Sequence, residues 1–222
     1  MKKILRKLAT LFHNHKPQHT RNVRKSKGQS LVEFAIAFPV VIMLFAGVVE
    51  FGFILNYYLS LLDATRESAR VYSSGDPWIA GPYPNWFFID AANKVKTNLE
   101  PTNVNDTTRK IVLDPAVDDV IITVYSVCGN KIYSFPSEAG YHLYGNGTPI
   151  FNNSSMLASR LSGAPDTGIL LVEEHYNYHQ VLALPWITAF LSNPLPLRAY
   201  SIMPLHAAEY PLASYAPVIT CP

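Results

Sequence analysis

The strongest pattern in the chain is an apolar run over residues 31–62, in which Glu33 and Glu50 are the only charged residues. The hydrocarbon core of a bilayer is about 30 Å thick, and a helix rising about 1.5 Å per residue needs roughly 20 residues to cross it. Residues 31–50 have this length, so they predict a membrane-spanning helix with an acid near each end. Pro39 removes one backbone donor inside the span and predicts a kink rather than a break.

Apolar positions continue beyond the span at intervals of three and four, while charged residues collect on another face up to residue 72. Ser-Ser-Gly-Asp-Pro at 73–77 predicts the end of this helix, with Gly75 in a left-handed cap and Pro77 just beyond it. We therefore expect one helix of roughly 45 residues that carries both the span and an amphipathic stalk. A signal anchor followed by a docked helix would have the same length, so length alone does not identify the function of this helix.

Residues 76–222 predict an extracytoplasmic domain of the α+β class with an antiparallel sheet packed on the stalk. Amphipathic spacing, β-branched residues and a Gly129-Asn130 turn carry this prediction. The expected elements are a short helix over 88–99, a hairpin of strands 119–128 and 131–135, strands over 169–182 and 197–206, and a helical turn within 184–192. The stretch 136–168 is rich in Gly, Asn, Ser and Pro, so it predicts a long loop with little structure of its own.

The strand over 169–182 places Glu173, His175, Asn177 and His179 on one face, which we interpret as an exposed sheet face. A metal site is the alternative, but two histidines four residues apart on a strand are separated by about 13 Å. The chain also lacks a G-x-S-x-G motif, a phosphate loop and a dinucleotide fingerprint. We predict no catalytic, cofactor or metal site, and an envelope enzyme is the least favoured class.

Charge divides the chain at Gly28. Nine of the 18 Lys and Arg residues precede Gly28, whereas all 16 acids follow it, so residues 29–222 have a formal net charge of −7 (9 − 16). The basic segment predicts a cytoplasmic N-terminus by the positive-inside rule, with residues 76–222 outside. Because the outer domain is acidic, nucleic acid is not expected as its partner.

The junction Gly28-Gln29-Ser30-Leu31-Val32-Glu33-Phe34-Ala35 resembles the processing site of type IV pilin-like precursors, with a basic leader ending in Gly and Glu as the fifth residue after it. Together with Pro39, the string Gly47-Val48-Val49-Glu50-Phe51-Gly52 and the string Ala64-Thr65-Arg66-Glu67-Ser68-Ala69-Arg70, it is similar to the TadE-like pseudopilins of the tight-adherence (Tad) apparatus. The similarity is close over residues 27–72.

This resemblance implies a bacterial or archaeal envelope protein that is cut by a prepilin peptidase between Gly28 and Gln29. Its expected partners are the lipid bilayer, that peptidase, other pilin or pseudopilin subunits and the inner-membrane platform of a Tad-like apparatus. The location that the resemblance implies is the cytoplasmic membrane, as a single-pass protein, or an extracellular pilus into which the protein is incorporated. The implied divisions are a cleaved leader (1–28), a transmembrane and stalk helix (29–75) and the outer domain (76–222).

The resemblance also assigns roles to the two acids. Glu33 would pair with the new α-amino group of a neighbouring subunit, since a carboxylate and an ammonium buried together each avoid a desolvation cost of several kcal/mol. Glu50 lies about 25 Å further along the helix, so we expect it to contact a partner helix or the membrane interface instead.

The two cysteines, Cys128 and Cys221, predict one disulfide, because the expected compartment is oxidising and Cys221 lies in a tail that would otherwise fray. Two buried free thiols are the alternative.

The leading function is thus a minor pilin or pseudopilin-like component acting in pilus biogenesis, adhesion or secretion. The alternative is a stand-alone single-pass membrane protein whose outer domain binds a ligand. Cleavage after Gly28 separates the two, since a simple anchor would retain its basic leader.

Overall fold

The computed structural model describes residues 28–101, 103, 106, 111–159 and 165–221. The chain divides into two compact units, Met1–Leu44 and Phe45–Pro222. Apart from Gly28, the basic leader therefore lies outside the described residues. Helix α2 (Gln29–Tyr72) begins in the first unit and ends in the second.

The predicted long helix is confirmed, because α2 has 44 residues and continues through Pro39. It begins where the carbonyl oxygen of Gly28 accepts a hydrogen bond from the Val32 N–H at 3.1 Å. It ends at Tyr72, as the Gly-Asp-Pro signal indicates, but Gly75 does not adopt the expected left-handed conformation. Its N–H instead bonds to the Tyr72 carbonyl at 3.0 Å, and a Cβ at this glycine would lie 3.0 Å from the Phe87 ring.

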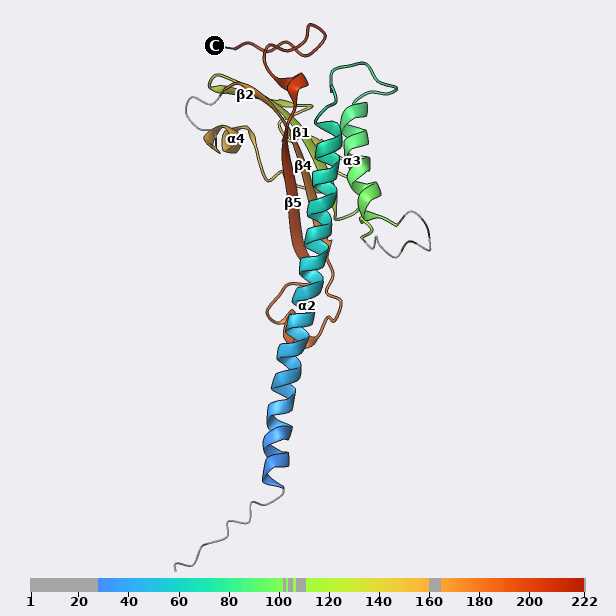
Figure 1. Cartoon of the computed structure of the whole chain (residues 1–222), viewed down its shortest axis with the longest axis vertical. Helices are drawn as coiled ribbons and strands as arrows, with labels where there is room; N and C mark the ends of the chain where they lie inside the picture. Colours follow the sequence, from blue (N-terminus) through green and yellow to red (C-terminus); the bar gives the residue numbers. More distant parts are fainter. Residues whose placement is uncertain (1–27, 102, 104–105, 107–110, 160–164, 222) are drawn as a thin grey trace, which may run out of the picture. The chain divides into compact units, whose positions relative to one another are not determined.

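The second unit contains the predicted antiparallel sheet, so the α+β class is confirmed (Figure 1). The strand order is β2-β1-β4-β5, and β3 also pairs with β1. The strands are β1 (Asp119–Cys128), β2 (Lys131–Phe135), β3 (Tyr141–His142), β4 (Thr167–Tyr178) and β5 (Leu195–Pro204). The hairpin of β1 and β2 has the bounds predicted from sequence, and Gly129 takes a φ of 55° at its turn, where glycine is favoured.

The main core lies between one face of the sheet and two helices, α2 from Phe45 onward and α3 (Trp86–Leu99) (Figure 1). Alanines allow the two helices to approach closely, and the Ser68 hydroxyl donates to the Ala91 carbonyl at 2.7 Å. The sheet contributes alternate apolar side chains from its two central strands, as its period of two requires. These are Val120, Ile122, Val124, Leu170 and Val172.

The face of β4 that was expected to be exposed is largely covered, so that expectation is wrong for Glu173 and His175, which are buried; Asn177 is half-buried, and His179, just beyond β4, is exposed. The segment predicted as a long loop contains β3, which pairs with β1 within the sheet, and α4 (Asn153–Ser159), which packs on this face through Met156. Residues of the same segment cover Glu173, which is 0% exposed. The Glu173 carboxylate accepts the Ile150 N–H at 2.7 Å. Alternation along β4 predicted which residues share a face. It could not predict that a polar segment would lie over that face and donate backbone hydrogen bonds to the buried carboxylate of Glu173.

Asp119 holds the same covering segment at its other end. Its carboxylate accepts the N–H groups of Tyr144 and Gly147 at 2.9 and 2.8 Å and lies 2.7 Å from His142 Nδ1. Burial alone would raise the pKa of Asp119, but the hydrogen bonds from His142 and the backbone outweigh burial and hold that pKa below its ordinary value. The folded segment therefore favours the ionised carboxylate.

The remaining short elements connect the sheet at its ends. Helix α5 (Pro185–Thr188) lies between β4 and β5, and the 3₁₀ helix η1 (His206–Ala208) follows β5. The Trp78 indole N–H donates to the Ala207 carbonyl at 3.0 Å, which joins the residues after α2 to those after β5.

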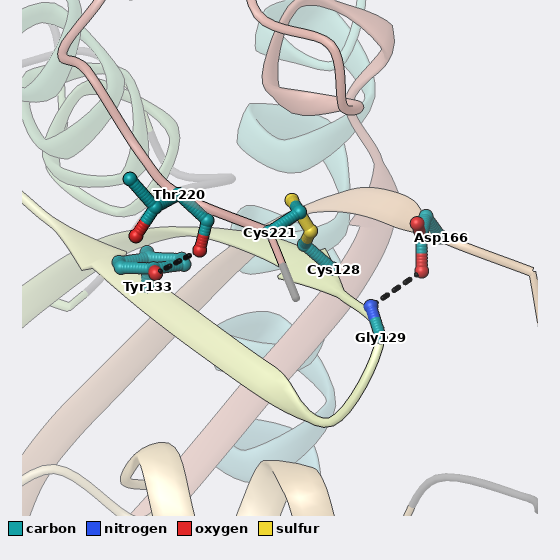
Figure 2. Close-up of a disulfide and its surroundings, with 6 residues drawn as sticks. All are labelled: Cys128, Gly129, Tyr133, Asp166, Thr220 and Cys221. Carbon is teal, nitrogen blue, oxygen red and sulfur yellow. Dashed lines mark hydrogen bonds between the residues drawn. A yellow bond between two sulfur atoms is a disulfide. The ribbon is translucent and has the colours of Figure 1, made fainter.

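The C-terminal tail is attached to the tip of the β1–β2 hairpin (Figure 2). The structure joins Cys128 and Cys221 in a disulfide, with their Cα atoms 5.6 Å apart. Beside it, the Tyr133 hydroxyl donates to the Thr220 carbonyl at 2.7 Å, and the Gly129 N–H donates to the Asp166 carboxylate at 2.8 Å. The residue just before β4 and the C-terminal tail therefore both bind to the tip of this hairpin.

We predict that Cys221→Ser lowers the free energy of unfolding. The bond closes a sequence separation of 93 residues, for which the chain-entropy model gives up to about 4 to 5 kcal/mol. Urea unfolding of the full chain in detergent would measure the loss, and Cys128→Ser should produce the same loss alone or combined with Cys221→Ser. Recovery of two alkylatable thiols from unfolded, unreduced protein would contradict the bond.

A buried acid without a hydrogen-bond partner lies in the main core. Glu174 is 0% exposed, and within the described residues neither of its carboxylate oxygens has a partner. Burial, followed by the nearby carboxylates of Asp118 and Asp119, raises the pKa of Glu174 well above its ordinary value. The folded protein therefore favours the protonated side chain.

This shift predicts a stability that falls with rising pH. An unfolded Glu ionises near about pH 4.3, whereas Glu174 stays protonated in the folded chain, so stability is lost as pH rises above that value. Glu174→Met should remove this dependence and raise the free energy of unfolding at neutral pH by about 1 to 3 kcal/mol. Glu174→Gln is the matched control, since it removes ionisation but keeps a polar side chain. Unfolding curves with an unchanged pH slope in both variants would refute the assignment.

Candidate assembly site

The described part of the first unit, residues 28–44, is exposed along its whole length. Near its start the Gln29 side-chain amide donates to the Glu33 carboxylate at 3.1 Å. Phe34 and Phe38 stack one turn apart, with ring centroids separated by 5.2 Å. The structure thus places Gly28, Gln29 and Glu33 at the beginning of α2, and the apolar side chains around them are exposed.

Among the described residues, α2 is the one helix long and apolar enough to cross a membrane, and 6% of its most apolar stretch is buried. A core helix of a soluble domain would bury most of such a stretch. An uncovered apolar helix is instead typical of a membrane anchor, which supports single-pass anchoring of the chain.

Burial along α2 begins within the second unit, at Ala46 and Glu50, which lie one turn apart and are 8% and 1% exposed. The Glu50 carboxylate accepts three hydrogen bonds from residues near the end of β4. The donors are the Tyr178 hydroxyl (2.7 Å), the Val181 N–H (3.0 Å) and the Leu182 N–H (2.8 Å). A buried carboxylate is stable when donors surround it in this way, so Glu50 attaches the helix to the outer domain.

The local structure around these donors explains how they converge. Tyr178 is the last residue of β4, and its ring packs on Tyr57 of α2 with centroids 5.0 Å apart. Burial, and then the hydrogen bond to Glu50, raise the pKa of Tyr178 above its ordinary value, so its hydroxyl remains a donor. Ala183, directly after the two backbone donors, has a φ of 44°, which costs a non-glycine residue about 1 kcal/mol or more. The turn is thus held in a strained conformation beside Glu50.

The sequence identified Glu50 but not its partners. The structure gives this acid three donors from its own chain, 128 to 132 positions away, and its expected contact with a partner helix or the membrane interface stays a prediction. The shared parity of Tyr178 with the core residues of β4 was a usable signal, because it places the hydroxyl on the helix side of the sheet. The two N–H donors could not be recognised from the sequence, since every residue type except proline carries a backbone N–H.

A second feature of α2 faces away from the outer domain. Val48, Phe51, Leu55 and Leu59, which we call the stalk stripe, are spaced by three and four residues and remain 45–69% exposed. Gly47 and Gly52 lie beside it with open space where a Cβ would be. An exposed apolar stripe with small neighbouring residues suits close packing against another helix.

Metal ions require a set of donor side chains that lie close together. Among the residues that the structure describes, no group of three or more His, Cys, Asp and Glu side chains could hold a metal ion. The structure therefore offers helix surfaces and one buried anchor as its candidate functional elements.

Residues 28–70 match the family model of TadE-like proteins. The resemblance seen in the sequence is thus confirmed for this segment. The TadE-like segment begins at Gly28 and contains Glu33, Pro39 and Glu50, as well as the stalk stripe, whereas Cys128 and Cys221 lie outside it. No curated protein and no solved structure matches the chain.

The geometry of Glu50 generates a stability prediction. Glu50→Ala leaves the Val181 and Leu182 N–H groups and the Tyr178 hydroxyl without their acceptor, and each unsatisfied buried donor costs about 1 to 3 kcal/mol. We expect the variant to loosen the outer domain, with increased amide exchange at residues 178–184 measured by mass spectrometry. Glu67→Ala is the control, because that acid is exposed and pairs with Arg70 on the helix surface. Equal exchange in both variants would show that Glu50 is not the anchor.

Proposed function

We propose that the protein is a minor pilin or pseudopilin-like structural component of a Tad-type apparatus, acting in pilus biogenesis, adhesion or secretion. The observation that carries the proposal is the TadE-like segment that starts at Gly28 and continues into an uncovered apolar helix. In this function the chain acts through helix packing and surface recognition, without catalysis.

Processing between Gly28 and Gln29 is the first step of the proposal. The Gly28 carbonyl is the acceptor for the first hydrogen bond of α2, from Val32. Cleavage by a prepilin peptidase would remove this acceptor and create an ammonium group on Gln29 at the helix N-terminus. A cation there opposes the helix dipole, so it gains from a nearby carboxylate.

Glu33 supplies that carboxylate in the proposed assembly. In the structure it is exposed and accepts only a side-chain amide from Gln29 among the interactions of the described residues. In a bundle of subunits, the acid of one chain would neutralise the Gln29 ammonium of its neighbour, which sets the axial stagger between the two helices. Pro39 lies between these charges and the stalk stripe, where it would bend the helix. The stalk stripe would then pack against the stalks of neighbouring subunits.

The proposed location is the cytoplasmic membrane, with the basic leader in the cytoplasm and residues 76–222 outside. The positive-inside rule supports this orientation, because residues 1–27 contain nine Lys and Arg residues and no acid. A disulfide between Cys128 and Cys221 agrees with an oxidising compartment.

Cleavage is tested by sequencing the N-terminus of the membrane-extracted protein. We expect the mature chain to begin at Gln29, and Gly28→Val to retain the leader, because a branched side chain replaces the glycine at the cleaved bond. A mature protein that keeps residues 1–28 would favour a stand-alone membrane anchor instead.

The role of Glu33 is tested by assembly. We expect Glu33→Ala to be made, inserted and cleaved but not to co-purify with partner subunits, while Glu33→Asp retains part of this ability. Glu67→Ala, an exposed acid on the same helix, should assemble normally. Unimpaired fibre formation by Glu33→Ala would show that the acid does not pair with the neighbouring amine.

A further inference from the structure

The segment between β4 and β5 is unusually apolar for a surface connection. From residue 175 to residue 197 the chain has no Asp, Glu, Lys or Arg. Phe190 is 87% exposed, Val181 52% and Leu191 39%, while Trp186 is half-buried. Residues 181–192, which we call the apolar loop, therefore present large apolar side chains to their surroundings.

The apolar loop has a defined shape, which a loosely attached segment would lack. At its base, the Gln180 side-chain amide donates to the Leu191 and Ser192 carbonyls at 3.1 and 3.2 Å. Helix α5 adds an internal turn, and the Leu191 N–H bonds to the Ile187 carbonyl at 2.9 Å. Phe190 is thus carried by a loop whose two ends are held by Gln180 and Glu50 and whose middle is a helical turn.

Glu50 sets the level of this loop along α2. Its carboxylate lies within 3.0 Å of the Val181 and Leu182 nitrogens, and residue 50 ends the apolar span that starts at Leu31. The polar interface of a bilayer is about 5 to 7 Å thick on each side. A loop bonded directly to the residue at the end of the span therefore lies at the same interface.

We propose that the apolar loop is a second membrane contact, with Phe190 and Leu191 inserted into the lipid interface beside α2. The absence of charge from residue 175 to residue 197 removes the groups that would resist insertion, and aromatic residues favour this depth. The loop and α2 would hold the outer domain at two points, which limits how far it can tilt about its anchor.

The bilayer is a better occupant of the apolar loop than a partner protein, because the apolar surface of α2 that faces lipid continues to the level of the loop. The exposed apolar surface of α2 at Phe45 and Val48, 68% and 69% exposed, occurs at the level of Ala46 and Glu50, where the loop is attached. Lipid that surrounds this end of the span would reach the loop without any further element. The proposal uses the membrane anchoring of the proposed function but not its role in a fibre.

The test uses the full chain, with its disulfide intact, reconstituted in phosphatidylcholine–phosphatidylglycerol vesicles. An environment-sensitive fluorophore is attached at Phe190→Cys, and at Val218→Cys as the control, because Val218 is 94% exposed but lies in the C-terminal tail. Lipids with a spin label near the acyl carbonyl should quench the probe at 190 and leave the probe at 218 unquenched.

A second pair of variants isolates the apolar side chain. With the probe at Val181→Cys, adding Phe190→Asp should abolish lipid quenching, whereas Phe190→Trp should preserve it. A probe at 190 no more quenched than one at 218 in vesicle-bound protein would overturn the loop contact but not the anchor, and so would quenching insensitive to Phe190→Asp. Protein that fails to float with vesicles would overturn both.

Discussion

The interaction on which the rest of the structure depends is the buried carboxylate of Glu50. Three donors surround it, one from the last residue of β4 and two from the turn that follows, although they lie 128 to 132 positions away in the sequence. Apolar packing alone tolerates sliding of a helix along a sheet, because one apolar contact can replace another. A one-turn slip of about 5.4 Å would leave both the acid and its donors buried and unpaired, so the carboxylate fixes the register of α2 on the sheet.

The packing above this anchor depends on that register. Ala64 and Ala69 of α2 and Ala91 and Ala92 of α3 are at most 3% exposed, and side chains this small bring the helix backbones together. The Ser68 hydroxyl reaches the Ala91 carbonyl only because the two helices are close. Larger residues at these positions would separate the helices and expose the aromatic cluster around Phe87 and Phe88.

The sequence predicted the helices and strands better than it predicted which side chains are buried and which groups bind them. The bounds of β1 and β2 followed from β-branched residues around Gly129-Asn130, and α3 followed from its apolar spacing, because both signals are local. Burial of Glu173 could not be predicted, since it depends on the Ile150 N–H, which belongs to a segment without a periodic pattern. For the same reason the sequence located Glu50 but not the backbone groups that bind it.

The two acids of the TadE-like segment differ in what their own chain provides. Glu50 is 1% exposed and has three donors from the same molecule, so a further partner would have to displace existing bonds. Glu33 is exposed and receives one side-chain amide bond from Gln29, a neutral donor that leaves its charge uncompensated. An uncompensated carboxylate inside a membrane or a helix bundle requires a cation from elsewhere. The distribution of donors therefore agrees with the proposed pairing of Glu33 with a neighbouring subunit, whereas the bonds of Glu50 join α2 to the end of β4 within one molecule.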